Sequence, residues 1–179
     1  MIAPANRLDA LAGILAYPEA DFADRVTRCG GLLAGAPAEA KLGFQQFVEG
    51  CNGKSPEELQ ELYTRTFDMN PDYALEVGWH LFGENYSRGE FLVEMRREIR
   101  TLGLKESAEL PDHLIHVLPV VARMKADRAG TFVSSRVIPA VDKILAAMAG
   151  KECAYEPLLK VIRVVVEAPS PLLMEDAKE

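Results

Sequence analysis

The sequence contains few cysteines, and none of them stands in a disulfide or metal-binding pattern. Three of its 179 residues are cysteines, Cys29, Cys51 and Cys153, and they are too far apart to form a Cys-x-x-Cys pair. This odd, widely spaced set excludes a disulfide-rich scaffold and indicates a chain that works in a reducing compartment.

An excess of positive charge is also lacking. The chain has 27 acidic residues against 20 lysines and arginines, which gives a formal net charge of -7. Because phosphate binding needs a basic patch, this composition argues against a nucleic-acid partner. It favours a partner that itself carries positive charge.

Long hydrophobic runs are absent as well. The longest, such as residues 164–166, fall far short of the length that spans a membrane. The first 15 residues contain Asp9 and no extended apolar stretch, unlike a secretory signal. We therefore expect a soluble, cytoplasmic protein that does not insert into a membrane.

Apolar residues at helical spacing recur along the whole chain, whereas no strand-like alternation of useful length occurs. Leu8, Leu11, Ile14 and Leu15 form the first such stripe, and Pro18 ends it. The sequence predicts a single all-α, bundle-like domain of about eight or nine helices over residues 1–168. Residues 169–179 are expected to form a frayed tail.

Several helix boundaries can be predicted from local sequence. Residues 55–58, Ser-Pro-Glu-Glu, form a capping box, and residues 87–90, Ser-Arg-Gly-Glu, resemble a second one. Residues 70–72, Asn-Pro-Asp, predict another start, and so do Pro111 and Asp112. The expected ends of the helices that begin near residues 71 and 87 are Gly83 and Gly103.

Sequence patterns of enzymes are missing. Gly30-Gly31 lacks the Lys-Ser/Thr that follows a phosphate-binding loop, and no Gly-x-Ser-x-Gly motif occurs. His113 and His116 stand three residues apart and follow Asp112, so these residues with His80 leave a metal-dependent hydrolase as an alternative. Their spacing matches no strong zinc motif. We therefore expect neither catalysis nor a bound metal.

Two segments contain more than a plain helical bundle requires. In residues 62–68, Tyr63 and Phe67 fall on one helical face, where they are either core aromatics or part of a binding surface. In residues 109–114, a helix start accounts for Pro111 and Asp112 but does not require Glu109 or His113.

These segments resemble the NarJ/TorD/DmsD family of molybdoenzyme assembly chaperones, and most closely its nitrate reductase branch, also called the delta subunit. The resemblance covers about residues 8–165 and rests on the order of four features. These are Leu-Ala-Tyr-Pro (residues 15–18), Tyr-x-x-x-Phe-Asp (63–68), His-Leu-Phe-Gly (80–83) followed by Ser-Arg-Gly (87–89), and Leu-Pro-Asp-His-Leu (110–114). The chain departs from the branch at Ile115, where a proline is usual, and at Pro119, where a glutamate is frequent.

The resemblance implies a chaperone that binds the N-terminal segment of the apo catalytic subunit of a molybdoenzyme. Such a protein assists insertion of the molybdenum cofactor before membrane docking or export. The cofactor belongs to the client, so none is expected to be bound here, and the cofactor delivery machinery is a further implied partner. A structural subunit of the mature reductase is the remaining alternative.

A helical bundle can receive a basic, amphipathic peptide in an apolar groove with an acidic rim. We expect the aromatic side chains of the groove to be Tyr63, Phe67, Trp79, Phe82 and Tyr86, and the acids of its rim to be Asp68, Glu109 and Asp112. His113 is expected to tune binding with pH, and Arg88 to hold a loop through an ion pair. The full set of expected peptide-binding residues is Tyr63, Phe67, Asp68, Trp79, His80, Phe82, Tyr86, Arg88, Glu109, Leu110, Pro111, Asp112 and His113.

Overall fold

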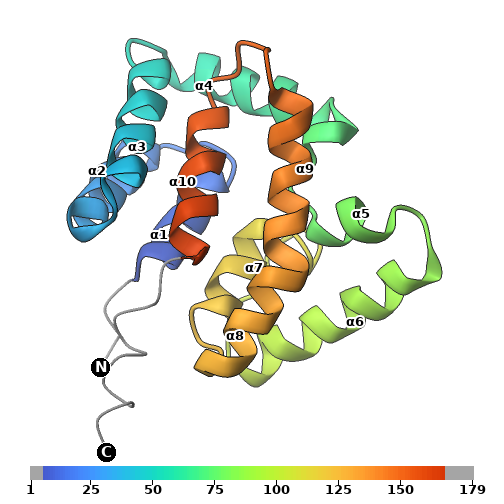
Figure 1. Cartoon of the computed structure of the whole chain (residues 1–179). Helices are drawn as coiled ribbons and strands as arrows, with labels where there is room; N and C mark the ends of the chain where they lie inside the picture. Colours follow the sequence, from blue (N-terminus) through green and yellow to red (C-terminus); the bar gives the residue numbers. More distant parts are fainter. Residues whose placement is uncertain (1–5, 168–179) are drawn as a thin grey trace, which may run out of the picture.

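The computed structural model describes residues 6–167, and this part of the chain is helical and without strands, as the sequence predicted (Figure 1). Ten α labels mark nine separate helices in the described part, because a π-helical turn (Val133–Val137) joins α8 to α9 without a break. The helices are α1 (Arg7–Leu15), α2 (Phe22–Leu32), α3 (Ala38–Cys51), α4 (Pro56–Tyr63), α5 (Val77–Phe82), α6 (Tyr86–Thr101), α7 (Leu114–Val121), α8 (Ala126–Phe132), α9 (Ile138–Met148) and α10 (Glu156–Glu167). The tail predicted over residues 169–179 lies outside the described residues.

The last helix occupies the middle of the fold. In Figure 1, α10 lies between α3 on one side and α9 on the other, and α1 packs against α2 and α7. One continuous core of buried apolar side chains joins these helices. None of the described helices combines the length and the apolar character needed to cross a bilayer.

The first predicted capping box is present at the start of α4. The Ser55 hydroxyl accepts a hydrogen bond from the Glu58 N–H at 3.2 Å, and the Glu58 carboxylate accepts one from the Ser55 N–H at 2.7 Å. Pro56 occupies the first turn, where its missing N–H costs nothing. Local sequence was sufficient here because all the partners lie within four residues.

The second predicted capping box was wrong. Asn85 caps α6 by accepting a hydrogen bond from the Ser87 N–H at 3.2 Å, so residues 87–90 lie inside the helix. Its predicted end is confirmed, since Gly103 adopts a φ of +63° after the last turn. Asparagine is as good a cap as serine, and the helix therefore begins earlier.

The start predicted at residues 70–72 was also displaced. Asn70 caps only a short 3₁₀ helix (Pro71–Tyr73), and α5 begins at Val77. Residues between them are extended because they pair with a distant segment: the Val77 N–H donates to the Asp112 carbonyl at 2.8 Å, and the Leu114 N–H donates to the Leu75 carbonyl at 2.9 Å. The same pairing keeps Pro111 and Asp112 out of α7.

A π-helical turn (Thr64–Asp68) continues α4. The Thr66 hydroxyl donates to the Leu62 carbonyl at 2.7 Å, and the Met69 N–H reaches back five residues to the Thr64 carbonyl at 3.1 Å. Widened turns of this kind are rare and often occur at functional sites. This one brings Phe67 and Asp68 to the wall of the cavity described next.

Candidate functional site

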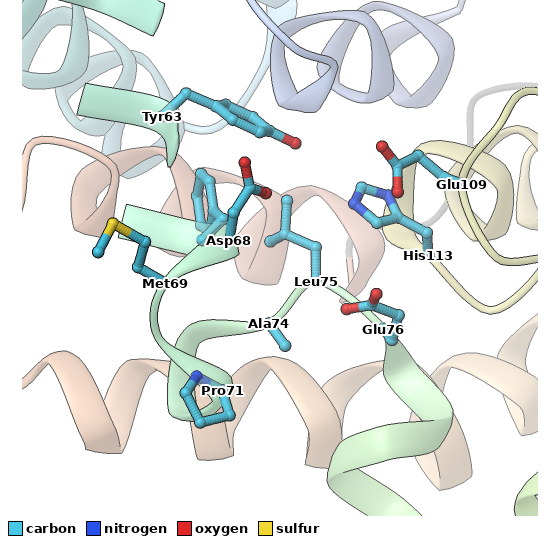
Figure 2. A pocket seen from close by; sticks show the side chains of 10 residues that line it. Tyr63, Asp68, Met69, Pro71, Ala74, Leu75, Glu76, Glu109 and His113 are labelled. Atoms are coloured by element: carbon cyan, nitrogen blue, oxygen red, sulfur yellow. The ribbon is translucent and has the colours of Figure 1, made fainter. Parts of the chain in front are cut away.

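A cavity of about 370 Å³ opens between the end of α4, its π turn, the extended residues before α5 and the loop before α7 (Figure 2). It therefore joins the two segments that the sequence singled out. Its walls are made by Tyr63, Phe67, Asp68, Met69, Pro71, Ala74, Leu75, Glu76, Glu109 and His113.

Two aromatic rings form one wall, and the core holds them in place. The centroids of Tyr63 and Phe67 lie 5.1 Å apart, and the ring of Tyr155 packs behind Phe67 with a centroid distance of 4.7 Å. The Tyr63 hydroxyl donates to the Leu15 carbonyl at 3.0 Å. Because both rings are buried on their other sides, this wall is preformed.

The opposite wall is set by the pairing of Glu76 with His113. These residues form an isolated antiparallel bridge, flanked by the backbone hydrogen bonds of Val77 and Leu114. Figure 2 shows the two side chains on the same side of the cavity, with the Glu109 carboxylate beyond them. The bridge thus places residues from separate parts of the chain at one site.

Three carboxylates face the cavity, from Asp68, Glu76 and Glu109 (Figure 2). Within residues 6–167, no lysine or arginine lies within 4.0 Å of any of them. Burial raises the pKa of Glu76, and the nearby carboxyls of Asp112 and Glu109 add to this rise, whereas the Arg88 guanidinium opposes it. The cavity is therefore acidic, with three carboxylates that form no ion pair among the described residues.

His113 contributes an uncharged donor to the wall. Only 4% of its surface is exposed, and its Nδ1 accepts a hydrogen bond from the Ile115 N–H at 3.1 Å. Burial, assisted by the nearby His116, lowers the pKa of His113 from 6.5 to about 3. The imidazole is consequently neutral near pH 7, so the expected tuning of binding with pH by His113 has no support from a proton gained or lost near neutrality.

Replacing His113 with asparagine should flatten the pH dependence of stability. A buried histidine with a lowered pKa takes up its proton only on unfolding. Below pH 6.5 it therefore reduces the free energy of unfolding by up to about 1.4 kcal/mol per pH unit. Asparagine still caps α7 but does not titrate. Urea unfolding of both proteins between about pH 5 and pH 7.5 measures the difference in slope.

The stability of wild type must be set against that of His113→Asn because other groups also titrate in this pH range. His80 and His116 have lowered pKa values and act in the same direction, whereas Glu76 and Asp112 have raised pKa values and act in the opposite one. All four remain in the variant. Parallel stability curves for wild type and His113→Asn would show that His113 is protonated as readily in the folded state as in the unfolded chain.

Asp112 was expected on the rim, but it is fully buried beneath it. Its Oδ2 accepts a hydrogen bond from the Gly78 N–H at 3.1 Å and lies 3.5 Å from the Arg88 Nε. Burial raises the pKa of Asp112 in spite of the opposing effect of Arg88. The guanidinium of Arg88 also stacks on the Trp79 ring, 5.5 Å from its centroid, so this group joins α5, α6 and the loop before α7.

The other expected peptide-binding residues lie outside the cavity wall. Trp79 and His80 bond to the carbonyls of Pro71 and Ala74, at 3.0 and 2.6 Å, and so hold the lining segment from behind. Phe82 packs against Phe91, and Tyr86 is 82% exposed on α6. Pro111 is buried beside the cavity, and Leu110 is exposed next to Glu109.

Of the expected residues, the cavity is lined by Tyr63, Phe67, Asp68, Glu109 and His113. The lining residues that the sequence analysis missed are Met69, Pro71, Ala74, Leu75 and Glu76. Except for Met69, they lie in a segment that was interpreted as the start of a helix. Pairing with residues 112–114 turns this segment towards the site, and no local sequence pattern predicts that pairing.

The histidines do not form the metal site considered as an alternative. The Nε2 of His80 lies 2.6 Å from the Ala74 carbonyl, and the Nε2 of His116 lies 3.0 Å from the Ser107 hydroxyl. Among the residues that the structure describes, no three histidines, cysteines or carboxylates are grouped so as to hold a metal ion. The arrangement therefore does not support a hydrolase built on His80, Asp112, His113 and His116.

Three exposed apolar side chains line the cavity or adjoin residues that line it. Met69 lines the cavity and is 74% exposed, and Leu110 follows the lining residue Glu109 and is 42% exposed. Tyr17 is 44% exposed and meets Tyr63 edge-on at a centroid distance of 5.5 Å. The site thus combines an acidic cavity with exposed apolar side chains in or next to its lining.

Comparisons with known proteins place this arrangement in context. A family model described as nitrate reductase delta subunit matches residues 33–152. The nitrate reductase molybdenum cofactor assembly chaperone NarJ of Escherichia coli K12 is 24% identical over 153 residues, which cover 83% of this chain and 64% of that protein. The protein of the same name from Escherichia coli O157:H7 gives the same values. The chain thus spans less than two thirds of the length of these relatives.

Proposed function

The chain belongs to the nitrate reductase delta subunit family, and from this membership we propose that it is an assembly chaperone for a nitrate reductase-like molybdoenzyme. The resemblance noted in the sequence is confirmed at the level of the family and of its nitrate reductase branch. In this role the protein binds another polypeptide and catalyses no reaction.

The proposed ligand is the N-terminal segment of the apo catalytic subunit. The observation that carries this proposal is the cavity shared by residues 63–69 and 109–113, which is acidic inside and apolar at its border. An amphipathic peptide can bury apolar side chains on Met69 and Leu110, which supplies most of the affinity. The carboxylates speed the encounter with a basic peptide and orient it.

Binding at this segment gives the chaperone a physical means of timing. While the client's leading end is held, it is not available for docking at the membrane or for export. The catalytic subunit can then receive its molybdenum cofactor, which stays with the client. We place this exchange in the cytoplasm, with the cofactor delivery machinery as a further partner.

Isothermal titration calorimetry with a synthetic peptide tests the proposal. The peptide copies the N-terminal residues of the molybdoenzyme catalytic subunit from the same organism. We expect binding by the full chain, weakened at least about tenfold in the double variant Met69→Ser/Leu110→Ser, because two exposed apolar contacts are lost.

Leu42→Ser provides the matched control. Leu42 is 57% exposed on α3 and does not line the cavity, so its loss should leave the affinity unchanged. A wild-type protein that fails to bind the peptide would overturn the proposal. Permanent co-migration of the chain with the active, cofactor-loaded enzyme would instead identify a structural subunit.

A further inference from the structure

We propose that the cavity is a receptor for one basic side chain of the bound polypeptide, with the His113 Nε2–H donating to a main-chain carbonyl of the same segment. This inference rests on the proposed function and specifies which chemical group of the client the cavity recognises. It assigns separate roles to the interior of the cavity and to its border.

The first observation is the convergence of three acids that local structure does not explain. Asp68 ends a π turn, Glu76 lies in an extended segment, and Glu109 lies in a loop more than thirty residues further along the chain. All three face the same space (Figure 2), and no lysine or arginine of residues 6–167 pairs with them. Like charges around one space repel each other, and a bound cation removes that repulsion.

The second observation is the unused donor of His113. Its Nδ1 accepts the Ile115 N–H, so the proton of the neutral ring resides on Nε2. Nε2 has no hydrogen-bond partner among the described residues and is not one of their fully buried unpaired atoms, so it is open to the cavity that His113 lines. Since the ring is uncharged, it does not repel a cation bound beside it.

An unpaired donor beside three carboxylates suits a ligand that carries both a cation and an acceptor. A bare metal ion or a protonated amine supplies the cation but has no acceptor of its own for the His113 N–H. An arginine or lysine residue within a polypeptide supplies both, through its side chain and its main-chain carbonyl. The guanidinium of arginine has five donors that several carboxylates can share.

The remaining walls suit the apolar stem of such a side chain. The rings of Tyr63 and Phe67 line the cavity together with the acids, and Leu75 lies between Asp68 and His113 in Figure 2. Long basic side chains bury their methylene groups against apolar surface while the charged end is paired. Outside, Met69 and Leu110 then contact the neighbouring residues of the peptide.

Neutral analogues of the basic residues test this inference directly. In the N-terminal peptide of the catalytic subunit, each arginine is replaced in turn by citrulline and each lysine by acetyl-lysine, which remove the charge but keep the chain length. We expect one position at which the replacement weakens binding to the wild-type chain at least about tenfold, since about 1.4 kcal/mol corresponds to this factor.

The same replacement should matter much less when the acids are neutralised. In the triple variant Asp68→Asn/Glu76→Gln/Glu109→Gln, we expect the charged and neutral peptides to bind within about twofold of each other. The exposed pair Asp68→Asn/Glu109→Gln leaves half-buried Glu76 intact and should show an intermediate ratio, which guards against misfolding of the triple variant. Glu39→Gln, an exposed acid on α3, should retain the full wild-type ratio.

The two possible failures are distinguishable. If every neutral analogue binds the wild-type chain as tightly as the original peptide, the cavity does not recognise a basic side chain, while the proposed chaperone function stands. An equal loss in wild type and triple variant would likewise overturn the inference, because the effect would then arise elsewhere. If the unmodified peptide does not bind, the proposed function itself fails.

Discussion

Replacing Tyr155 with alanine is expected to lower the free energy of unfolding by about 3–5 kcal/mol, the usual cost of removing a fully buried aromatic side chain. Tyr155 is completely buried just before α10, where its ring packs against Phe47, Tyr63 and Phe67 at centroid distances of 5.3, 6.1 and 4.7 Å. The truncation leaves a cavity behind the aromatic wall of the site. Urea denaturation at neutral pH measures the loss.

Tyr155→Phe is the matched control. The Tyr155 hydroxyl is buried and has no hydrogen-bond partner within residues 6–167, so its removal takes away an unsatisfied polar group and no bond. We expect stability within about 1 kcal/mol of wild type, or slightly above it. A large loss in Tyr155→Phe would show that the hydroxyl is bonded, and a small loss in Tyr155→Ala would show that the ring cluster contributes little.

The second large effect is expected at Gly78, the second residue of α5. A Cβ at this position would lie 2.6 Å from the Asp112 Oδ2 and 2.9 Å from the Phe91 ring, so Gly78→Ala forces the buried carboxylate or the ring to move. Overpacking costs about 1–3 kcal/mol, and a weakened hydrogen bond to a charged group adds about 1.5–3 kcal/mol. We expect thermal and urea unfolding to show a total loss of about 3 kcal/mol or more.

Gly89→Ala separates this steric effect from helix propensity. Gly89 lies inside α6, is exposed, and has no atom within 4 Å of the position that a Cβ would occupy. Alanine there should raise stability by about 0.5–1 kcal/mol, because it restricts the unfolded chain without a clash. If the two alanine variants were equally stable, Asp112 would not be held against Gly78 as the structure shows.

Both variants also bear on the site. Tyr155 supports the aromatic wall, and Gly78 allows Asp112 to lie close enough to hold the loop that carries Glu109 and His113. We therefore expect peptide affinity to fall in Tyr155→Ala and Gly78→Ala and to be retained in their controls. Tertiary packing and ligand binding depend on the same few contacts here.

Features with partners close in the chain were predictable. The capping box at Ser55 and the glycines that end α5 and α6 rest on interactions within a few residues, and all are present. The resemblance to the chaperone family rested on the order of short motifs and was likewise recovered. A predicted helix start was wrong where another nearby residue could also cap the helix, as Asn85 does for α6. Another was wrong where a segment distant in the chain pairs with the backbone, as at residues 74–76.

The exact membership of the site could not be read from the chain. Tyr63, Phe67, Asp68, Glu109 and His113 attracted notice because a helical bundle did not require all of them, and they do line one cavity. Glu76 carried no such signal, since a lone glutamate before a helix is ordinary. The expected place of Asp112 on the rim was wrong, because its burial depends on contacts with Gly78 and Arg88, which lie on other helices.

The sequence by itself determined the helical class, the capping box at Ser55, the glycines that end α5 and α6, the acidic character and, through the order of its motifs, the family resemblance, because each depends on composition, on periodicity or on residues close in the chain. Only the tertiary structure decided that residues 74–76 are extended, that His113 is buried and neutral, and that three acids face one cavity. These features arise from contacts between segments more than thirty residues apart, and burial, pKa and backbone pairing at such contacts follow from what the fold brings together.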